Sequence, residues 1–355
     1  MITVELIQAA QGDSIWIEYG ETIDSLHRIL IDGGTNATYK TLKKRIEALP
    51  PFARHFDLLV ITHIDADHIA GVLKLFEDTT LGLTFSDIWF NGYKHLSNTT
   101  ARGVKQAEKL TTYLEQNNIP WNRAFQGKSV CIPKNNKPLI LTLDGGMELT
   151  LFSPTRKALA KLKPKWTKEL IKSGLLPGPS ALSHVEPTQS TRAPRTLLPD
   201  VESLARTSFK SDTSLTNGSS IAFLASYDDK KMLFSGDAYA TTLLDSIKKY
   251  LPKCEPLYLD LFKVPHHGSD CNISKQLLEH IRCNKYLISA NGAYHHHPDD
   301  VAIAKIITYG GHMSNIYFNY ISDYNQIWKD QELQKNHCYH AHYPKKEDTS
   351  ITINL

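Results

Sequence analysis

A short run of histidine and aspartate residues carries the clearest chemistry in this sequence. His63, Asp65, Asp67 and His68 stand within six positions of one another, directly after the apolar segment 57–61. Imidazole nitrogens and carboxylate oxygens are the ligands that divalent cations take in proteins, and a loop at the end of a strand can present several of them together. The run therefore predicts a metal-binding loop.

Three further groups of polar residues follow apolar segments that are typical of strands. Asp237 follows the segment 233–236, the pair His266 and His267 follows 261–264, and His297 follows a segment that ends at residue 290. Each group alone is typical of a turn with a polar tip. Because all of them stand at the C-terminal ends of expected strands, together they predict one composite site.

The hydrophobic pattern predicts the strands and helices that would position these side chains. Alternating or continuous apolar runs predict strands over 3–7, 14–18, 28–31, 57–61, 148–152, 219–227, 231–235, 258–264 and 286–289. Helical spacing of apolar residues predicts helices over 39–49, 69–76, 104–116, 241–250, 274–281 and 299–307. Two strand-rich halves with helices between them indicate a mixed α/β fold of two packed sheets with helices outside.

Seven motifs occur in order along nearly the whole chain: Gln11-Gly12-Asp13-Ser14, Leu30-Ile31-Asp32-Gly33-Gly34, the segment 62–71, Asn217-Gly218-Ser219-Ser220, Phe234-Ser235-Gly236-Asp237, Lys263-Val264-Pro265-His266-His267-Gly268-Ser269 and His297-Pro298. Together they resemble the ComEC-like branch of the metallo-β-lactamase superfamily. The resemblance implies a four-layer αββα sandwich formed by one domain, residues 1–355. The chain looks like a free-standing soluble relative, without the membrane part of ComEC.

The resemblance also implies roles for individual residues around two divalent metal ions. His63 and Asp65 would hold the first ion, Asp67 and His68 the second, and Asp237 would bridge both. Three more residues complete this expected centre: His297 at the second ion, Asp32 as a hydrogen-bond partner that orients a metal-binding imidazole, and Asn217, which stands where many relatives have a first-site histidine.

The pair His266 and His267 stands where related phosphodiesterases place a histidine that contacts the scissile phosphate. The sequence leaves open which of the two does so. Lys263 and Ser269, which flank the pair, are expected to bind the substrate. In the resulting mechanism, hydroxide held between the metals attacks phosphorus, Asp67 is essential, and His266 or His267 protonates the leaving oxygen.

The ligand types bear on which metal is expected. Asp65 stands where the broader superfamily has a second histidine, and Asn217 replaces a further imidazole. Oxygen donors suit Mn²⁺ or Mg²⁺, whereas an imidazole-rich site suits Zn²⁺. We therefore expect Mn²⁺ to support activity at least as well as Zn²⁺, with Mg²⁺ as an alternative.

The expected function is metal-dependent hydrolysis of phosphate esters, most simply a nuclease or phosphodiesterase that cleaves DNA or RNA. Two alternatives stay open. One is hydrolysis of small or cyclic nucleotides or of other esters, including lactams, because one fold hosts many chemistries. The other is a regulated subunit of a larger assembly, for example a defence system, with a protein partner.

The segment 156–212 differs from the rest and is interpreted as an insertion, partly mobile. From 156 to 210 it has eleven Lys or Arg and four Asp or Glu, whereas the whole chain has a net charge of +3. Its first part has a basic helical pattern around Trp166, broken by Pro164, and its second part is rich in Pro and Ser. The charge either attracts a polyanion or is simply solvated. The segment could also regulate the site. It could bind a partner protein, or a protease could cleave it at Arg192, Arg195 or Arg206.

Two compositional features bear on the cellular setting. The apolar runs have only the length of a strand, and the N-terminus does not resemble a signal peptide, so we expect a cytoplasmic protein that does not span a membrane. The five cysteines include no Cys-x-x-Cys pair, which favours reduced thiols.

Overall fold

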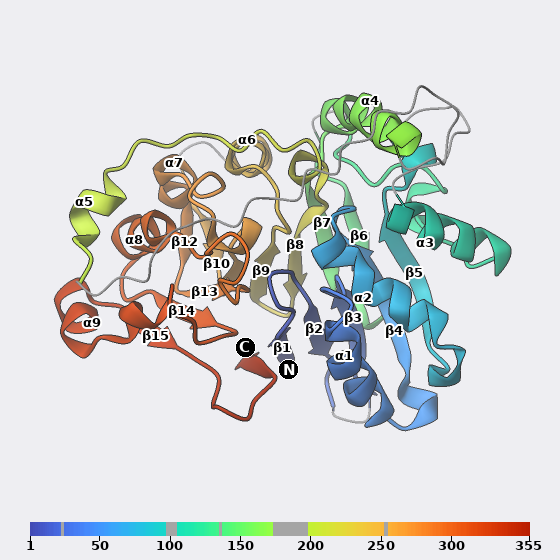
Figure 1. Ribbon diagram of the computed structural model, residues 1–355, viewed down its shortest axis with the longest axis horizontal. Helices are drawn as coiled ribbons and strands as arrows, with labels where there is room; N and C mark the ends of the chain where they lie inside the picture. Colours follow the sequence, from blue (N-terminus) through green and yellow to red (C-terminus); the bar gives the residue numbers. More distant parts are fainter. Residues whose placement is uncertain (23–24, 97–104, 135–136, 173–197, 252–254) are drawn as a thin grey trace.

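The computed structural model describes residues 1–22, 25–96, 105–134, 137–172, 198–251 and 255–355. Within these ranges two β-sheets pack face to face, and helices cover both outer sides (Figure 1). The first sheet has the strand order β16-β1-β2-β3-β4-β5, and the second has the order β15-β14-β13-β11-β9-β8-β7-β6. A separate parallel pair joins β10 to β12.

The first sheet comes mainly from the N-terminal part of the chain. Its strands are β1 Ile2–Ile7, β2 Ile15–Tyr19, β3 His27–Ile31, β4 His55–Ile61, β5 Thr84–Phe90 and β16 Ser350–Asn354. The last strand, β16, pairs antiparallel with β1, so both termini lie close together at this edge (Figure 1).

The second sheet comes from the rest of the chain. Its strands are β6 Ile140–Thr142, β7 Glu148–Ser153, β8 Ala222–Tyr227, β9 Lys230–Phe234, β11 Leu261–Lys263, β13 Lys285–Ile288, β14 Asn315–Phe318 and β15 His340–His342, while β10 Leu257–Leu259 and β12 Ile281–Cys283 form the separate pair. From β9 to β15 the neighbouring strands are parallel, so their C-terminal ends share one edge.

Three apolar cores define four layers. Along β4, Leu58 and Val60 face the second sheet, whereas Leu59 and Ile61 face the helices. The helices on the side of the first sheet are α1 Thr38–Glu47, α2 Ala66–Glu77, α3 Lys105–Gln116 and α4 Arg156–Lys172. Those on the other side are α5 Val201–Ala205, α6 Ala240–Tyr250, α7 Lys275–Glu279, α8 Asp300–Tyr309 and α9 Gln331–His337. The expected αββα sandwich is therefore the observed fold.

Two expected elements differ from the structure. The strand expected over 258–264 is two strands, β10 and β11, because Asp260 between them bonds to β9 instead, accepting a hydrogen bond from the backbone N–H of Lys231. The expected break at Pro164 is absent, and α4 continues through it. A proline inside a helix costs about 3 kcal/mol, but Leu162 and Trp166 on either side of it are buried in the core and hold both halves.

Only parts of the expected insertion belong to the described residues. Segment 173–197, which includes Arg192 and Arg195, lies outside them. Of the described parts, α4 packs on the outer face of the first sheet through Trp166. Helix α5 packs against α8, and its residues Val201 and Ala205 are buried. Within the described ranges, every helix is too short or too polar to span a bilayer.

Candidate metal centre

The histidine and aspartate run spans the loop after β4 and the first turn of α2: His63 and Asp65 lie in the loop, and Asp67 and His68 lie on α2. Close backbone contacts fix this loop against the turn after β3: the N–H of Gly33 donates to His68 O at 2.8 Å, and the N–H of Gly71 donates to Gly34 O at 3.0 Å. A Cβ atom on Gly71 would lie 1.9 Å from Gly33 O, so only glycine permits this approach. The contact holds Asp32 directly beside the ring of His68.

Three histidine rings around this loop have their Nδ1 atom occupied by a fixed hydrogen-bond partner. His68 Nδ1 lies 2.8 Å from Asp32 Oδ2, and His267 Nδ1 lies 2.9 Å from the carbonyl of Ser289. His63 Nδ1 lies 3.0 Å from the hydroxyl of Thr62. Because that hydroxyl donates its own proton to Asp32, it must accept from His63. The hydrogen-bond network thus places the proton on Nδ1 in each ring and leaves a lone pair on each Nε2.

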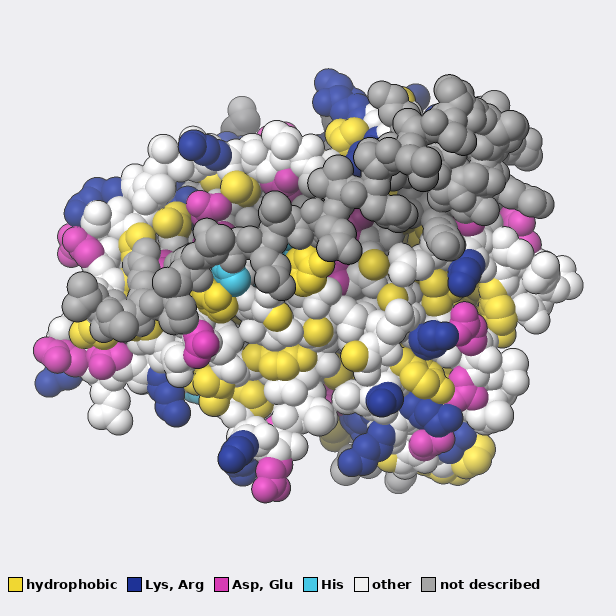
Figure 2. All heavy atoms as spheres, in the orientation of Figure 1, with side chains coloured by type: hydrophobic (Ala, Val, Ile, Leu, Met, Phe, Trp, Pro, Cys, Tyr) yellow, Lys and Arg dark blue, Asp and Glu magenta, His cyan; other side chains and the backbone are white. Residues whose placement is uncertain are grey.

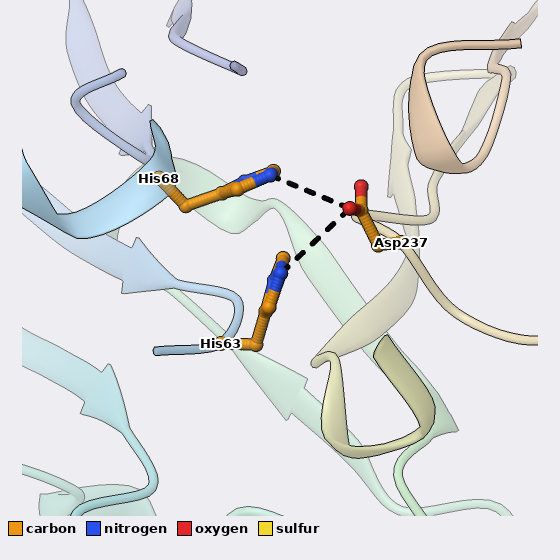
Figure 3. Close-up of side chains that lie close together, drawn as sticks. All are labelled: His63, His68 and Asp237. Carbon is orange, nitrogen blue, oxygen red and sulfur yellow. Dashed lines mark ion pairs between the residues drawn. The ribbon is translucent and has the colours of Figure 1, made fainter. Parts of the chain in front are cut away.

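The three Nε2 atoms converge on Asp237, which follows β9. Its Oδ2 atom lies 3.7 Å from His63 Nε2, 3.5 Å from His68 Nε2 and 3.6 Å from His267 Nε2. Figure 3 shows His63, in the loop after β4, and His68, on α2, pointing at Asp237. All three nitrogens and Asp237 Oδ1 are buried without a hydrogen-bond partner among the described residues.

Such an arrangement is costly unless a cation completes it. Buried polar atoms are almost always hydrogen-bonded, and acceptor atoms that face one another without a donor repel. A divalent metal ion accepts lone pairs from imidazole and carboxylate at once. The residues present therefore fit a bound metal ion.

The potential ligands form four overlapping groups, in each of which the ligand atoms lie within 4.8 Å of one another. Two groups consist of residues that face the centre: His63, His68 and Asp237 in the first, and Asp67, His68 and His267 in the second. The other two contain Asp13, once with Asp32 and His68 and once with Asp237 and His267. The first two groups share His68, so their ligand atoms surround two neighbouring positions. The structure thus brings together four residues predicted as metal ligands and adds His267 to them.

The charges of the centre favour bound positive charge. Burial alone would raise the pKa of Asp237, but the charges of His267 and His68 outweigh it and hold that pKa well below its usual range. Burial alone would lower the pKa values of His68 and His267, but the charge of Asp237 outweighs it and raises both. Both rings therefore favour positive charge beside Asp237, which is the charge that a bound metal ion would supply.

Two other predicted ligands lie at the margin of the centre. Asp65 Oδ2 lies 3.5 Å from His63 Nε2 and accepts a hydrogen bond from Thr216, and its side chain is 40% exposed. His297 lies beside His266 instead, with 5.3 Å between ring centroids, and its Nδ1 is 3.4 Å from Asp299 Oδ2. Neither residue belongs to the two groups of converging ligand atoms among the described residues.

His266 differs from its neighbour in exposure and in partner. Its side chain is 23% exposed, against 4% for His267. Its Nδ1 donates to Asn272 Oδ1 at 2.9 Å, because the amide nitrogen of Asn272 faces the carbonyls of Asp237 and Ala238. This contact turns Nε2 of His266 toward Asp237 Oδ2, 3.9 Å away. His266 is therefore the more exposed of the two adjacent histidines at the centre.

The predicted partner residues Asp32 and Asn217 both lie next to histidines of the centre. Asp32 accepts hydrogen bonds from Thr62 and His68, which is the orienting contact expected for it. Asn217 lies beside His266, and its amide donates to Asp212 Oδ2 at 2.8 Å. A second carboxylate, that of Asp212, thus lies 3.7 Å from His266 Nδ1.

Lys263, which was expected to bind substrate, has a partner inside the protein. Its side chain is fully buried and forms an ion pair with Asp13. Asp13 Oδ1 also lies 3.4 Å from His267 Nδ1. Lys263 thus neutralises a carboxylate behind His267. Ser269, expected in the same role, is also buried, and its Oγ accepts a hydrogen bond from the Cys271 N–H at 3.4 Å.

The residue that the sequence analysis missed is Asp13. Its motif, Gln11-Gly12-Asp13-Ser14, contributed to the resemblance, but nothing local in it indicates a partner 250 positions away. The sequence feature that could have indicated the position of Asp13 is the preceding residue, Gly12. A Cβ atom on Gly12 would lie 1.7 Å from the carbonyl oxygen of Asp67, so the turn at Gly12 must pack directly on the metal-binding loop.

Comparisons with known proteins add limited information. No family model and no curated protein matches the sequence. Solved structures similar to this chain include human tRNase Z, short form (11% identity, covering 100% of this chain and 99% of that one, TM-score 0.44). They also include the metallo-β-lactamase fold protein YhfI from Bacillus subtilis (11%, 100% of both chains, 0.41) and Zn²⁺-bound PqqB from Methylobacterium extorquens (13%, 100% of both chains, 0.42). Because these TM-scores are below 0.5, the roles of individual residues are inferred from the distances and hydrogen bonds of the centre itself.

Proposed function

We propose that this chain is a metal-dependent hydrolase of the metallo-β-lactamase type that cleaves phosphodiesters, as a nuclease or related phosphodiesterase. The observation that carries the proposal is the convergence of three lone-pair Nε2 atoms on the buried carboxylate of Asp237. The ComEC-like branch remains a prediction from the sequence motifs.

Two divalent ions would fit these ligands. His63 and Asp237 would hold one ion, with Asp65 beside it, and Asp67, His68 and His267 would hold the other. Bound ions would lower the pKa of water for attack on phosphorus and would neutralise charge on the phosphoryl oxygens. The mixture of nitrogen and carboxylate donors suits Mn²⁺ as well as Zn²⁺, with Mg²⁺ as an alternative. Activity with Zn²⁺ alone would overturn the expected role of Mn²⁺.

His266 is the residue that moves a proton in this proposal. It is the more exposed histidine of its pair, and its Nε2 faces the centre. Protonated His266 would then donate from Nε2 to the leaving oxygen of the substrate.

The charge on α4 supports a polyanionic substrate. Lys and Arg side chains project at the top of the molecule, over α4 (Figure 2), and Arg156, Lys157, Lys161 and Lys165 are exposed there. α4 packs against the turn Asn217–Ser219, which borders the centre. Lysine and arginine near the site would attract the phosphates of a nucleic acid, with binding that weakens as salt increases.

The test is a panel of substrates with metal-stripped protein refilled with Mn²⁺, Zn²⁺ or Mg²⁺. Single- and double-stranded DNA, RNA, cyclic nucleotides and nitrocefin would each be incubated with the wild type and with Asp237→Asn. Cleavage of DNA or RNA that is lost in the variant supports the proposal. Cleavage of cyclic nucleotides or nitrocefin alone would favour the small-substrate alternative.

We propose separately that the insertion 156–212 regulates the activity of the enzyme. A further proposal is that a partner protein or a protease acts on this insertion. Limited trypsin digestion followed by the same nucleic-acid assay tests the control. Unchanged activity after cleavage between 173 and 210 would remove the idea.

A further inference from the structure

Lys305 on α8 is buried, and no ion pair joins its amine to an acidic side chain in the part of the chain that the structure describes. The side chain is 1% exposed. Its contacts among the described residues are a long hydrogen bond of 3.4 Å to the carbonyl of Ile273 and the ring of Phe209, whose centroid lies 5.6 Å from Nζ. An ammonium group has three donors, and lysine is almost never fully buried unless it is paired. Burial lowers the pKa of Lys305, and the charge of Asp270 offsets this only in part.

Lys305 is one of the residues that line a cavity of about 540 Å³ between α5, α6, α7 and α8. This volume lies within the range of pockets that bind small molecules, about 300–1,000 Å³. Two more cations, Arg206 and Lys275, line it, and none of its described lining residues is acidic. Arg206 and Lys275 pair with Glu202 and Glu279, but all four side chains are at least half exposed, so these ion pairs are weak and can rearrange.

The remaining lining indicates more than a site for a bare ion. Phe209 and Tyr309 present aromatic rings, and Gln276 adds an amide that can donate and accept hydrogen bonds. Lys275 Nζ lies 4.9 Å from the centroid of Tyr309, so cation and ring are adjacent. Cations suit a phosphate group, and a flat base can stack on an aromatic ring.

We propose that this cavity binds a nucleoside phosphate, with the phosphate at Lys305 and the base against Phe209 or Tyr309. The ligand would supply the negative charge that the buried ammonium lacks. None of the residues in this cavity belongs to the metal centre, so the proposal stands independently of the proposed hydrolase activity.

The test is calorimetric titration of the whole chain with AMP, adenosine and inorganic phosphate in buffer with a chelator. Wild type, Lys305→Met, Asp237→Asn and Lys248→Met would be compared. Lys248 is an exposed lysine on the neighbouring helix α6 and serves as the matched control. We expect AMP to bind the wild type, Asp237→Asn and Lys248→Met alike, and adenosine and phosphate to bind each more weakly. Loss of a charged hydrogen bond in Lys305→Met should weaken AMP binding about tenfold or more.

Several outcomes would overturn the proposal. AMP binding that is absent in the wild type, or unchanged in Lys305→Met, would remove the site. Binding lost in Asp237→Asn would assign AMP to the metal centre, and phosphate that binds as tightly as AMP would remove the nucleoside part. Lys305→Met should fold, because it removes an unpaired buried charge. If circular dichroism shows that it does not fold, the surface variant Arg206→Gln/Lys275→Gln replaces it, and unchanged AMP binding there would overturn the proposal equally.

Discussion

The Nε2 atom of His267 lies 3.6 Å from Oδ2 of Asp237, while Nδ1 on the other side of the same ring hydrogen-bonds the carbonyl of Ser289. The ring is therefore fixed with its lone pair toward the carboxylate. Its neighbour His266 is more exposed and bonds to Asn272 instead. Two adjacent histidines that the sequence could not distinguish thus have different surroundings.

This difference predicts opposite results for two alanine variants. His267→Ala should lose bound metal, because one of the converging ligands is removed. His266→Ala should keep its metal content but hydrolyse substrate about 10² to 10⁴ times more slowly, the usual contribution of a proton-transferring group. Elemental analysis of purified variants, together with kcat, checks both. Full metal content in His267→Ala would show that His267 is not a ligand.

Asp32 should control metal affinity without touching the metal. Its carboxylate accepts hydrogen bonds from the Thr62 N–H, the Thr62 hydroxyl and His68 Nδ1, so it orients the rings of both His63 and His68. Loss of such a partner typically lowers metal affinity about 10- to 100-fold, which we expect for Asp32→Asn in a competition titration. The matched control is Asp57→Asn, a buried aspartate of β4 that pairs with His27 away from the centre. Equal loss of affinity in both variants would mean a general effect on folding.

The buried pair Lys263 and Asp13 should affect stability more than substrate binding. Lys263→Met leaves Asp13 as a buried charge without its partner, and breaking such a pair costs about 3–5 kcal/mol of unfolding free energy. The double variant Lys263→Met/Asp13→Asn removes both charges and should recover much of that loss. Urea denaturation of the metal-free proteins measures both values. A stable Lys263→Met protein with only a raised KM would restore the substrate role for Lys263.

Stability of the metal-free protein should depend on pH in a defined direction. Burial alone would lower the pKa of His68. The charges of Asp237 and Asp32 outweigh burial and raise this pKa above its ordinary value of 6.5. A group whose pKa is raised on folding contributes stability that is present below its unfolded pKa and is lost as pH rises through the folded value. The free energy of unfolding, measured with a chelator present, should therefore fall as pH rises above about 6.5. Added Mn²⁺ or Zn²⁺ should reverse this trend, because metal binds the neutral ring, and a pH-independent free energy would contradict the account.

The sequence predicted the parts of the fold and centre that depend on local pattern. The run from His63 to His68 follows a buried strand, and the turn Asp32-Gly33-Gly34 contacts it, as expected. The strands β5, β6, β12, β14 and β16 were not predicted. Three of them are only three or four residues long, too short for a hydrophobic period to be evident.

The roles of His267, Lys263 and Asp13 could not be predicted because tertiary packing determines them. Lys263 stands in an apolar run that predicts a strand, but its burial depends on Asp13, which comes from the other sheet. The role of His297 as a metal ligand stays a prediction from the motif. In the structure its ring lies beside that of His266, and its Nδ1 lies 3.4 Å from an oxygen of Asp299.

The most direct measurement is hydrolysis of bis(p-nitrophenyl) phosphate by metal-stripped protein refilled with Mn²⁺, compared between wild type and Asp237→Asn. Asp237 Oδ2 lies within 4 Å of Nε2 atoms from His63, His68, His266 and His267, so its charge should be essential to the centre. We predict Mn²⁺-dependent hydrolysis by the wild type and none above background by Asp237→Asn. Equal rates in the two proteins, or no hydrolysis by refilled wild type, would contradict the assignment of a phosphodiester-cleaving metal centre.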